Sequence, residues 1–507
     1  MRKTVTHIIL FCLCLLSWTA SAQTKINFRA DMLYYDEAVL PGVERFTGNV
    51  VFNHGNTIGY CDSAYHYSDK NILEGFGENV RIHVNDSVTL YGKYLYYDGN
   101  TKIASISRNV VLMDNTSALY TDSLIYDLEQ DVGYYITPGK MINKDNVLTS
   151  ERGYFYTKLN EALLYDDVKL TSDSYNMDCQ ALKYNTQSEM VYFISRTHMV
   201  SDDNIIYTSS GWYNMATDIA NLVKDVIIFN ETQRLSGDTI YYDKNQRFGI
   251  GRGHVVIIDS AENYKATGNY IEHHETGGYS TITDRGQLIL IDRRDSLHLH
   301  ADTIKILFDS VRSPQFMNAY NHTKFYREDI QGACDSLTYN VIDSLLTMFY
   351  NPVIWSGENQ LTADTIYFEI LDSINILADL RKSGFIAASL FDEQDFNQIK
   401  GLNIIGHIRN RKLVEVDVIG NAECLYYIQE DDNSLMGVNS STTSEMKILF
   451  ENNEVQSIIF YNNPNGNIYP DEQLDAKERF LKDFRWLNTY RSLSPEDIFH
   501  TPIPREK

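Results

Sequence analysis

Hydrophobic and polar positions alternate in short runs along almost the whole chain. In a recurring element of the form Gly/Arg/Asp-x-Val-x-hydrophobic, two apolar residues flank a variable one, as at Val110 and Leu112. A period of two is typical of a β-strand with one face inside. The same spacing recurs at Val50 and Phe52, Val80 and Ile82, Val168 and Leu170, Val226 and Ile228, and Val255 and Ile257. The pattern predicts many short strands, and no helical period is found before the far C-terminus.

A second element returns between these strands. Residues 237–243 read Gly-Asp-Thr-Ile-Tyr-Tyr-Asp, and close or degenerate copies run from one end of the chain to the other. Taking the Asp or its equivalent as the marker gives positions 31, 62, 93, 122, 152, 180, 210, 238, 269, 302, 335 and 364, so the step stays between 28 and 33 residues. A period of this size, sustained over the chain, indicates a repeat architecture.

One unit of this kind cannot bury its apolar face alone, whereas stacked units form a continuous interior. We therefore predict an all-β fold, an elongated repeat β-jellyroll or β-taco solenoid of about 12 units with a small helical C-terminal tail. Ile240, two residues after the marker Asp238, is expected to face inward. The row of marker Asp residues is interpreted as structural, with carboxylates that accept backbone hydrogen bonds at turns.

The ends of the chain differ from the repeats. Residues 1–22 combine Arg2 and Lys3, a short apolar run and Ala20-Ser21-Ala22, which predicts a cleavable signal peptide. Residues 23–430 are assigned to the β-repeat domain and residues 431–470 to a terminal hairpin or cap, with strands at 446–450 and 455–460. Residues 471–507 are predicted to be a helical tail. It would hold an amphipathic helix over 471–488 and a short helix that Ser494 and Pro495 begin.

Composition narrows the class of protein. The formal net charge is −24, and removal of Arg2 and Lys3 with the signal would make it −24 − 2 = −26. Such a chain repels polyanions, so no nucleic-acid partner is expected. Cys61, Cys179, Cys334 and Cys424 remain after cleavage and are too scattered for a disulfide scaffold, so we interpret them as small buried residues.

No catalytic, cofactor or metal site is predicted. His298 and His300 share a strand face, but no third ligand follows at a diagnostic spacing. Gly249-x-Gly251-x-Gly253 precedes a strand and does not open a helix, so it is not a dinucleotide-binding loop. The chain is therefore not expected to be an enzyme.

The repeated x-G-N-V-x-hydrophobic and A/G-D-S/T elements, behind a signal peptide, resemble the OstA-like family of lipopolysaccharide transport proteins, which includes LptA. The resemblance covers roughly residues 24–430 and extends to the N-terminal domain of the LptD translocon, without its barrel. It implies a folded β-jellyroll whose apolar groove holds lipid acyl chains and carries lipopolysaccharide through the periplasm toward the outer membrane.

The resemblance also implies a site, a location and partners. The expected groove-lining residues are Val50, Phe52, Val80, Ile82, Val110, Leu112, Val168, Leu170, Val226, Ile228, Ile240, Val255 and Ile257. Expected partners are lipopolysaccharide or a related lipid, transport components with the same fold joined edge to edge, and the outer-membrane translocon. The expected location is the periplasm, with or without outer-membrane association. The lipid head group is expected at the open edge, near Arg81, Lys93, Lys169 and Lys183.

Three alternatives stay open at this point. The apolar rows could form a packed core without a cavity. The fold could be a β-helix that degrades polysaccharides, because such enzymes also stack Asp residues in rows. The chain could instead be a structural surface stalk that binds no lipid.

Overall fold

The computed structural model describes residues 25–84, 86–201, 203–390, 393–429, 435–451, 454–470 and 478–500. The predicted signal peptide lies outside the described residues. Within these ranges, no helix has the length and apolar character needed to cross a bilayer. The chain divides into two compact units, residues 1–202 with 214–216 and residues 203–213 with 217–507. We call them unit 1 and unit 2 and describe each by itself.

Unit 1 is built from antiparallel strands. They are β1 (Asn27–Arg29), β2 (Met32–Tyr35), β3 (Val43–His54), β4 (Thr57–Tyr67), β5 (Ile72–His83), β6 (Thr89–Asp98), β7 (Ile103–Met113), β8 (Ser117–Asp127), β9 (Val132–Tyr135), β10 (Gly139–Asn143), β11 (Asn146–Ser150), β12 (Arg152–Tyr156), β13 (Glu161–Thr171), β14 (Asn176–Asn185), β15 (Met190–Phe193) and β16 (Thr197–Val200).

Unit 2 has the same kind of strands and ends in two 3-10 helices. The strands are β17 (Ile205–Thr208), β18 (Ser210–Asn214), β19 (Ile219–Phe229), β20 (Gln233–Asp243), β21 (Phe248–Asp259), β22 (Tyr264–His274), β23 (Tyr279–Thr283), β24 (Gln287–Leu290), β25 (Leu297–His300), β26 (Thr303–Phe308), β27 (Pro314–Arg327), β28 (Ile330–Asn340), β29 (Leu345–Phe349), β30 (Val353–Ser356), β31 (Asn359–Thr362), β32 (Thr365–Ile370), β33 (Asn375–Leu390), β34 (Asp395–Arg409), β35 (Lys412–Gln429), β36 (Leu435–Glu451), β37 (Glu454–Tyr461) and β38 (Asn465–Tyr469). The helices are η2 (Asn488–Tyr490) and η3 (Pro495–Phe499).

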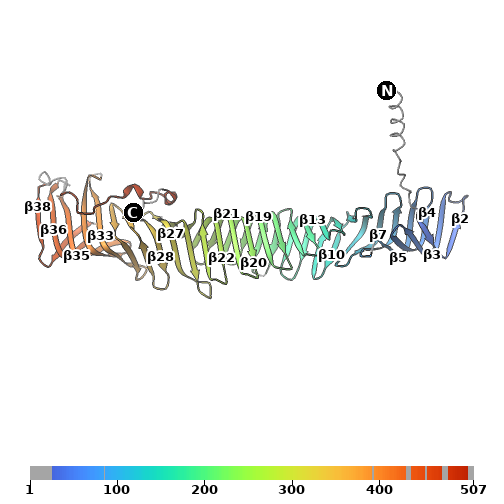
Figure 1. Cartoon of the computed structure of the whole chain (residues 1–507), viewed down its shortest axis with the longest axis horizontal. Coiled ribbons are helices and arrows are strands. Elements are labelled where there is room, and N and C mark those ends of the chain that lie inside the picture. Colours follow the sequence, from blue (N-terminus) through green and yellow to red (C-terminus); the bar gives the residue numbers. More distant parts are fainter. Residues whose placement is uncertain are drawn as a thin grey trace, which may run out of the picture. The chain divides into compact units, whose positions relative to one another are not determined.

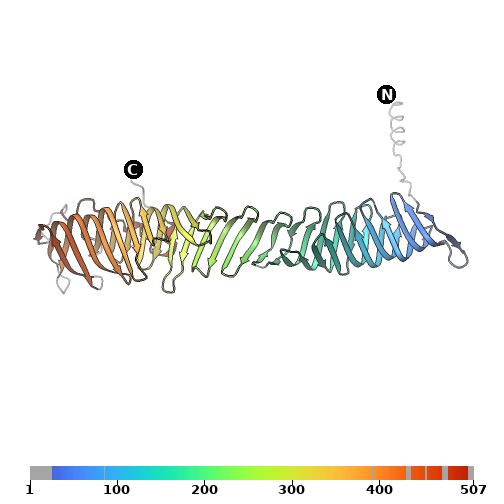
Figure 2. The same ribbon diagram turned by 90° about the horizontal axis from the view of Figure 1, so that it is seen from below.

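Within each unit, long strands pair mainly with their neighbours in sequence and lie side by side (Figure 1, Figure 2). Most long pairs contain one register shift near their middle, for example between Ser107 and Val110 in the β7–β8 pair. Such β-bulges bend a strand and raise its local twist. Each long strand therefore contributes its two halves to two walls. In unit 1, wall A contains residues 103–107 and 123–127, and wall B contains residues 110–113 and 118–121.

The bend is made by two consecutive residues with left-handed backbone angles. Arg108 and Asn109 have φ values of 69° and 54°, and Gly253 and His254 have φ values of 69° and 46°. Gly, Asn and Asp adopt left-handed angles at a lower steric cost than other residues, which explains why they recur before the repeated Val. At Gly253 an added Cβ would also lie 2.2 Å from a carboxylate oxygen of Asp238. The recurring element is therefore a corner followed by a strand.

The marker Asp residues secure these corners. The backbone N–H of Asp31 donates to the carbonyl of Gly48 at 2.9 Å, and its carboxylate accepts from the Asn49 amide at 2.8 Å. The Asp62 carboxylate accepts the backbone N–H of Glu78 at 2.9 Å. Asp238 and Asp302 instead contact a corner histidine, each at 2.9 Å. The predicted backbone hydrogen bond to a marker carboxylate is found at Asp62. At Asp31, Asp238 and Asp302 the carboxylate instead contacts a corner side chain.

The C-terminal end confirms one prediction and corrects another. Strands β36 and β37 form the expected hairpin, with Met446 opposite Phe460 and Ile448 opposite Ile458. The amphipathic helix predicted over 471–488 is wrong for the described residues 478–487, which form turns and irregular backbone; residues 471–477 lie outside the described part. The short helix after Ser494 is present as the 3-10 helix η3, where the Asp497 carboxylate accepts the backbone N–H of Ser494 at 2.8 Å.

The tail does not form the predicted helix because the sheet supplies its hydrogen-bond partners. Gln360 donates to the carbonyl of Arg485 at 2.7 Å and accepts the N–H of Leu487 at 2.6 Å. Gln398 likewise bridges the carbonyl of Arg479 and the N–H of Leu481, each at 2.8 Å. These backbone groups are thus paired without a helical ladder.

The tail covers the outer face of the wall formed by β25, β27, β28, β30, β31, β33 and β34. Figure 1 shows it in red along these strands. Phe396 packs against Phe484 and Trp486, at ring distances of 5.0 and 4.8 Å. Leu487 and Tyr490 pack on a buried cluster that contains Trp355. We call residues 478–500 the strap.

Candidate functional site

The interior between the two walls is the candidate site, and in unit 1 it is filled. The corners close one edge of the interior, and the hairpin turns between strands lie at the opposite edge. On the inner face of wall A, one row of side chains lies next to this opposite edge. We call this edge the mouth and this row the mouth row of unit 1. Strand registers align its members, and each is at most 1% exposed: Leu73, Tyr97, Ala104, Tyr126, Phe155, Ala162, Tyr184 and Val191.

Polar groups of the two walls meet across the mouth of unit 1. The Tyr97 hydroxyl on wall A lies 2.6 Å from Nδ1 of His54 on wall B. The Tyr184 hydroxyl donates to the side-chain oxygen of Asn143 at 2.7 Å. Both side chains of each pair are buried, so these bonds replace water and hold the walls together.

Asn143 also joins the turns at the mouth. Its amide nitrogen donates to the carbonyl of Thr116 at 2.9 Å on its own wall and to the carbonyl of Thr186 at 3.1 Å on the other wall. Lys144 forms an ion pair with Glu189, which adds a charged link nearby. Unit 1 is therefore closed along this part of its mouth.

Burial in the same interior changes the acidity of its tyrosines. It raises the pKa of Tyr126 and of Tyr184 to about 12, because the phenolate form loses its hydration. The pKa of Tyr97 is raised for the same reason. These tyrosines are neutral hydrogen-bonding groups at physiological pH.

The corresponding row of unit 2 is more exposed. Strand registers align its members along one wall, and we call them the mouth row of unit 2: Tyr242, Gly249, His273, Ser280, Ile306, Met317, Tyr339, Leu346 and Phe368. Tyr242 is 38% exposed, His273 is exposed, and the others are half-buried. On the facing wall, Ile228, Leu235 and Ile257 are also half-buried.

Nearer the corners, the interior of unit 2 is packed like that of unit 1. The residues there are at most 4% exposed: Leu222, Ile240, Ile271, Ile282, Ile304, Leu337, Met348 and Ile366. Several half-buried apolar residues pack on this core from the mouth side, including Leu235, Ile257, Ile306, Met317, Leu346 and Phe368. The interior of unit 2 thus has a closed base and an apolar, partly accessible rim.

The predicted lining residues all face this interior, but they do not share one environment. Eight of them lie in unit 1 and are at most 1% exposed: Val50, Phe52, Val80, Ile82, Val110, Leu112, Val168 and Leu170. In unit 2, Val226, Ile240 and Val255 are buried, whereas Ile228 and Ile257 are half-buried. That any of them contacts lipid stays a prediction.

The bases expected near a lipid head group lie on the outer face of unit 1. Arg81 stacks over the ring of Tyr60 at 4.3 Å, and Lys93 pairs with Glu78 at 2.6 Å. Lys169 and Lys183 pair with Asp167 and Glu161. Arg81, Lys93 and Glu78 also line a small outer pocket beside a corner. The three lysines are thus each paired with a carboxylate, and all four bases lie away from the inner rows.

Two histidine clusters lie on outer faces of unit 2. His298 contacts Gln287 at 3.2 Å, and His300 contacts the carbonyl of Gly286 at 2.6 Å and packs on Phe499 of the strap. Burial lowers the pKa of both imidazoles, because the charged form loses its hydration.

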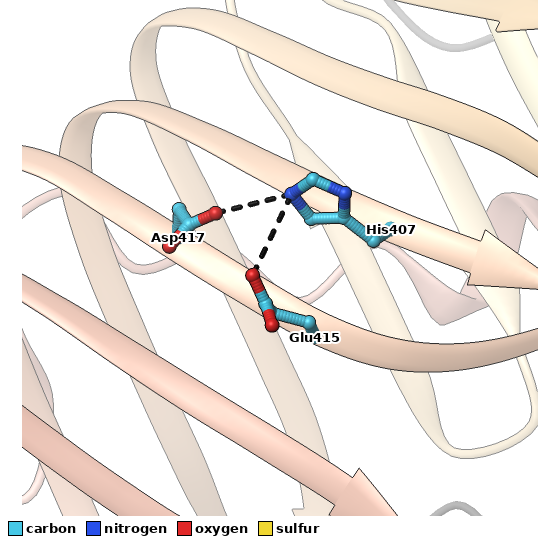
Figure 3. Close-up of side chains that lie close together, drawn as sticks. All are labelled: His407, Glu415 and Asp417. Atoms are coloured by element: carbon cyan, nitrogen blue, oxygen red, sulfur yellow. Dashed lines mark hydrogen bonds and ion pairs between the residues drawn. The ribbon is translucent and has the colours of Figure 1, made fainter.

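The second cluster has the composition of a possible metal site. Figure 3 shows His407 Nε2 between Asp417, at 3.1 Å, and Glu415, at 3.9 Å. Lys447 contacts both carboxylates and lies 3.2 Å from Asp417. Since the ammonium already supplies a positive charge between them, the group is explained as an ion-pair network on the sheet surface.

Sequence reasoning missed the mouth row of unit 2 and the residues that close unit 1. The period-two pattern identifies inward positions, but it is the same for a packed and an open interior. A usable signal was the recurrence of Tyr97, Tyr126 and Tyr184 at inward positions near strand ends, where a hydroxyl can reach a partner.

Family models for lipopolysaccharide transport proteins and their relatives match a segment of each unit. Residues 23–180 match the family model described as OstA-like protein. Residues 290–373 match the model described as the LptA/(LptD N-terminal domain) LPS transport protein. No curated protein sequence matches the chain.

Among solved structures, the chain is similar to LptH, the LptA homologous periplasmic component of the conserved lipopolysaccharide transport device from Pseudomonas aeruginosa. The match has 18% sequence identity, covers 21% of this chain and 77% of that chain, and has a TM-score of 0.19. The likeness to lipopolysaccharide transport proteins therefore depends on the two family models.

Proposed function

We propose that this OstA/LptA-like chain is a lipopolysaccharide transport protein that holds acyl chains of the lipid between its walls. The observation that carries the proposal is the pair of family matches, one in each unit, together with an inward face made mainly of apolar side chains. Burial of a methylene group contributes about 0.8 kcal/mol, so even a partly accessible apolar wall favours lipid tails over water.

The proposed location is the periplasm, and the proposed direction of transport is toward the outer membrane. Transport components of the same fold would join edge to edge, and the translocon would receive the lipid. The N-terminal edge suits such a contact: β2 exposes Met32, Leu33, Tyr34 and Tyr35, each between 53% and 57%. A terminal strand with exposed apolar side chains is a template for further strand pairing.

The test is depletion of the protein in its native host, combined with mass spectrometry of lipid that co-purifies with it. We expect lipopolysaccharide to co-purify and to decrease at the cell surface on depletion. Normal surface lipopolysaccharide after depletion would contradict the proposal.

A polysaccharide-degrading β-helix is the second class of function considered. Its stacked Asp residues would have to stand free in a cleft, whereas Asp31, Asp62, Asp238 and Asp302 are engaged at corners. We therefore propose no catalytic role for this row.

A further inference from the structure

We infer that only one of the two units binds the lipid tails: acyl chains occupy the mouth of unit 2, and the interior of unit 1 binds none. This inference rests on the proposed function and refines it. It concerns which part of the chain contacts lipid, and it names the mouth row of unit 2 as the contact surface.

The first support is the difference in packing at equivalent positions. In unit 1, Tyr97, Tyr126 and Tyr184 fill the mouth row and are fully buried. Their hydroxyls are engaged, two of them with groups on the opposite wall. A lipid chain entering there would have to break buried hydrogen bonds and leave polar groups unpaired, which is costly.

The second support is the chemistry of the mouth in unit 2. From Ile306 to Phe368 the row reads Ile, Met, Tyr, Leu, Phe on successive paired strands. Neighbouring strands are about 4.8 Å apart, so these five residues form an apolar track of roughly 20 Å. Half-buried apolar side chains in a continuous row gain free energy when an apolar ligand covers them.

The occupant follows from what the inner face can offer. The backbone groups along this track are engaged in the strand ladders that align it, and the side chains of Ile306, Met317, Leu346 and Phe368 carry no hydrogen-bonding atoms. A peptide laid on the track would therefore leave its own N–H and C=O groups without partners. An acyl chain has no such groups, so it fits the track without this cost.

The polar end of the lipid has a place at the rim of the same wall. Glu275 pairs with Arg312 and lies 3.8 Å from Arg247, so two guanidinium groups share one carboxylate. These arginines are 75% and 63% exposed, whereas Glu275 is 18% exposed. Exposed guanidinium donors bind phosphate well, and the inward Tyr242 and His273 lie on strands that end beside them.

Photocrosslinking of purified lipid A to the full chain tests the inference. A benzophenone amino acid at Met317 is expected to give a lipid adduct. The same group at the neighbouring Asn318, which points to the outer face, is expected to give none, and the group at Tyr126 in unit 1 is expected to give none.

Hydrogen exchange of the unmodified protein provides a second measurement that needs no variant. Lipid A is expected to slow exchange in β26–β29 and to leave β6–β8 unchanged. An adduct at Tyr126, or protection of β6–β8, would overturn the division between units and leave the proposed function standing. No binding of lipid A by the intact chain would overturn both.

Two variants distinguish binding of the acyl chains from binding of the head group. Met317→Glu is expected to weaken binding of lipid A and of a fluorescent long-chain fatty acid about tenfold or more, because it places a charge in the apolar track. Arg247→Ala with Arg312→Ala is expected to weaken binding of lipid A alone. Equal loss of both ligands in the arginine variant would overturn the placement of the head group.

Discussion

Unit 1 and unit 2 are built from the same repeat, yet their interiors differ. Both have corners made by paired left-handed residues and an inner row near the corner that is almost completely buried. They differ one row further out, where unit 1 has Tyr97 and Tyr184 bonded across to the other wall and unit 2 has Ile306 and Met317 half-buried. Whether such an interior is closed or open thus depends on the identity of a few residues at one position of the repeat.

The largest expected effect compares two phenylalanines. Phe52→Ala in unit 1 should cost about 3–5 kcal/mol of unfolding free energy, because Phe52 is fully buried and leaves a cavity. Phe368→Ala in unit 2 should cost roughly half as much, since its side chain is half-buried. Urea unfolding with hydrogen exchange resolved by strand would measure both. Equal costs would show that the mouth of unit 2 is packed as tightly as unit 1.

The next effect depends on pH. The pKa of Tyr126, Tyr135 and Tyr184 is raised by burial to about 12. Above the ordinary value of about 10, the unfolded chain releases these protons first, so unfolding becomes easier as pH rises toward 12. Each tyrosine should cost roughly 1.4 kcal/mol per pH unit in this window.

The stability of unit 1 should therefore fall between pH 10 and 12. Tyr126→Phe and Tyr184→Phe should flatten this dependence, although each lowers the stability at pH 7 by about 1–2 kcal/mol through the lost hydrogen bond. Tyr264 gives unit 2 a similar raised pKa of about 12 and serves as the internal reference. If the phenylalanine variants leave the dependence of stability on pH unchanged, the tyrosines are not its cause.

A third experiment concerns the strap, which has no counterpart among the described residues of unit 1. Gln360→Ala removes both of its bonds to Arg485 and Leu487 and should loosen the strap by about 1–3 kcal/mol. Limited proteolysis would detect the loosened strap as faster cleavage of the C-terminal segment. Gln456→Ala, at an exposed position, is the matched control and should leave cleavage unchanged.

The smallest expected effect is at the mouth of unit 2 itself. Arg411 and Asp292 belong to turns on opposite walls and form an ion pair at 3.0 Å, with both side chains substantially exposed. Arg411→Ala should change stability by less than about 1 kcal/mol, and the change should vanish in high salt. A larger or salt-independent loss, measured by urea unfolding, would show that this pair closes the mouth as the buried bonds close unit 1.

The sequence predicts the strands, the repeat and the inward positions well, because the period of two at residues such as Val110 and Leu112 has one physical cause. It predicts the corners only in part: the Asn and Asp residues before Val are visible, but their left-handed angles are not. The amphipathic helix was predicted wrongly over the described residues 478–487, because Phe480, Leu481, Phe484 and Leu487 also suit an irregular segment whose backbone is bonded by Gln360 and Gln398. The difference between the two interiors depends on contacts across the walls, which the period of two does not specify; the inward Tyr97, Tyr126 and Tyr184 are the local signal of them.

The hydrogen bonds of the strap have a consequence for the order of folding. Neighbouring strands of the repeat are close in sequence, so each strand can pair with the previous one after a short loop closes. The strap joins Leu487 to Gln360, 127 residues away, and His500 to Lys324, 176 residues away. Contacts of such separation form slowly and need their receiving surface in place. The C-terminal segment should therefore dock last. During refolding, the moment at which this segment becomes resistant to a protease would mark the end of the folding of unit 2.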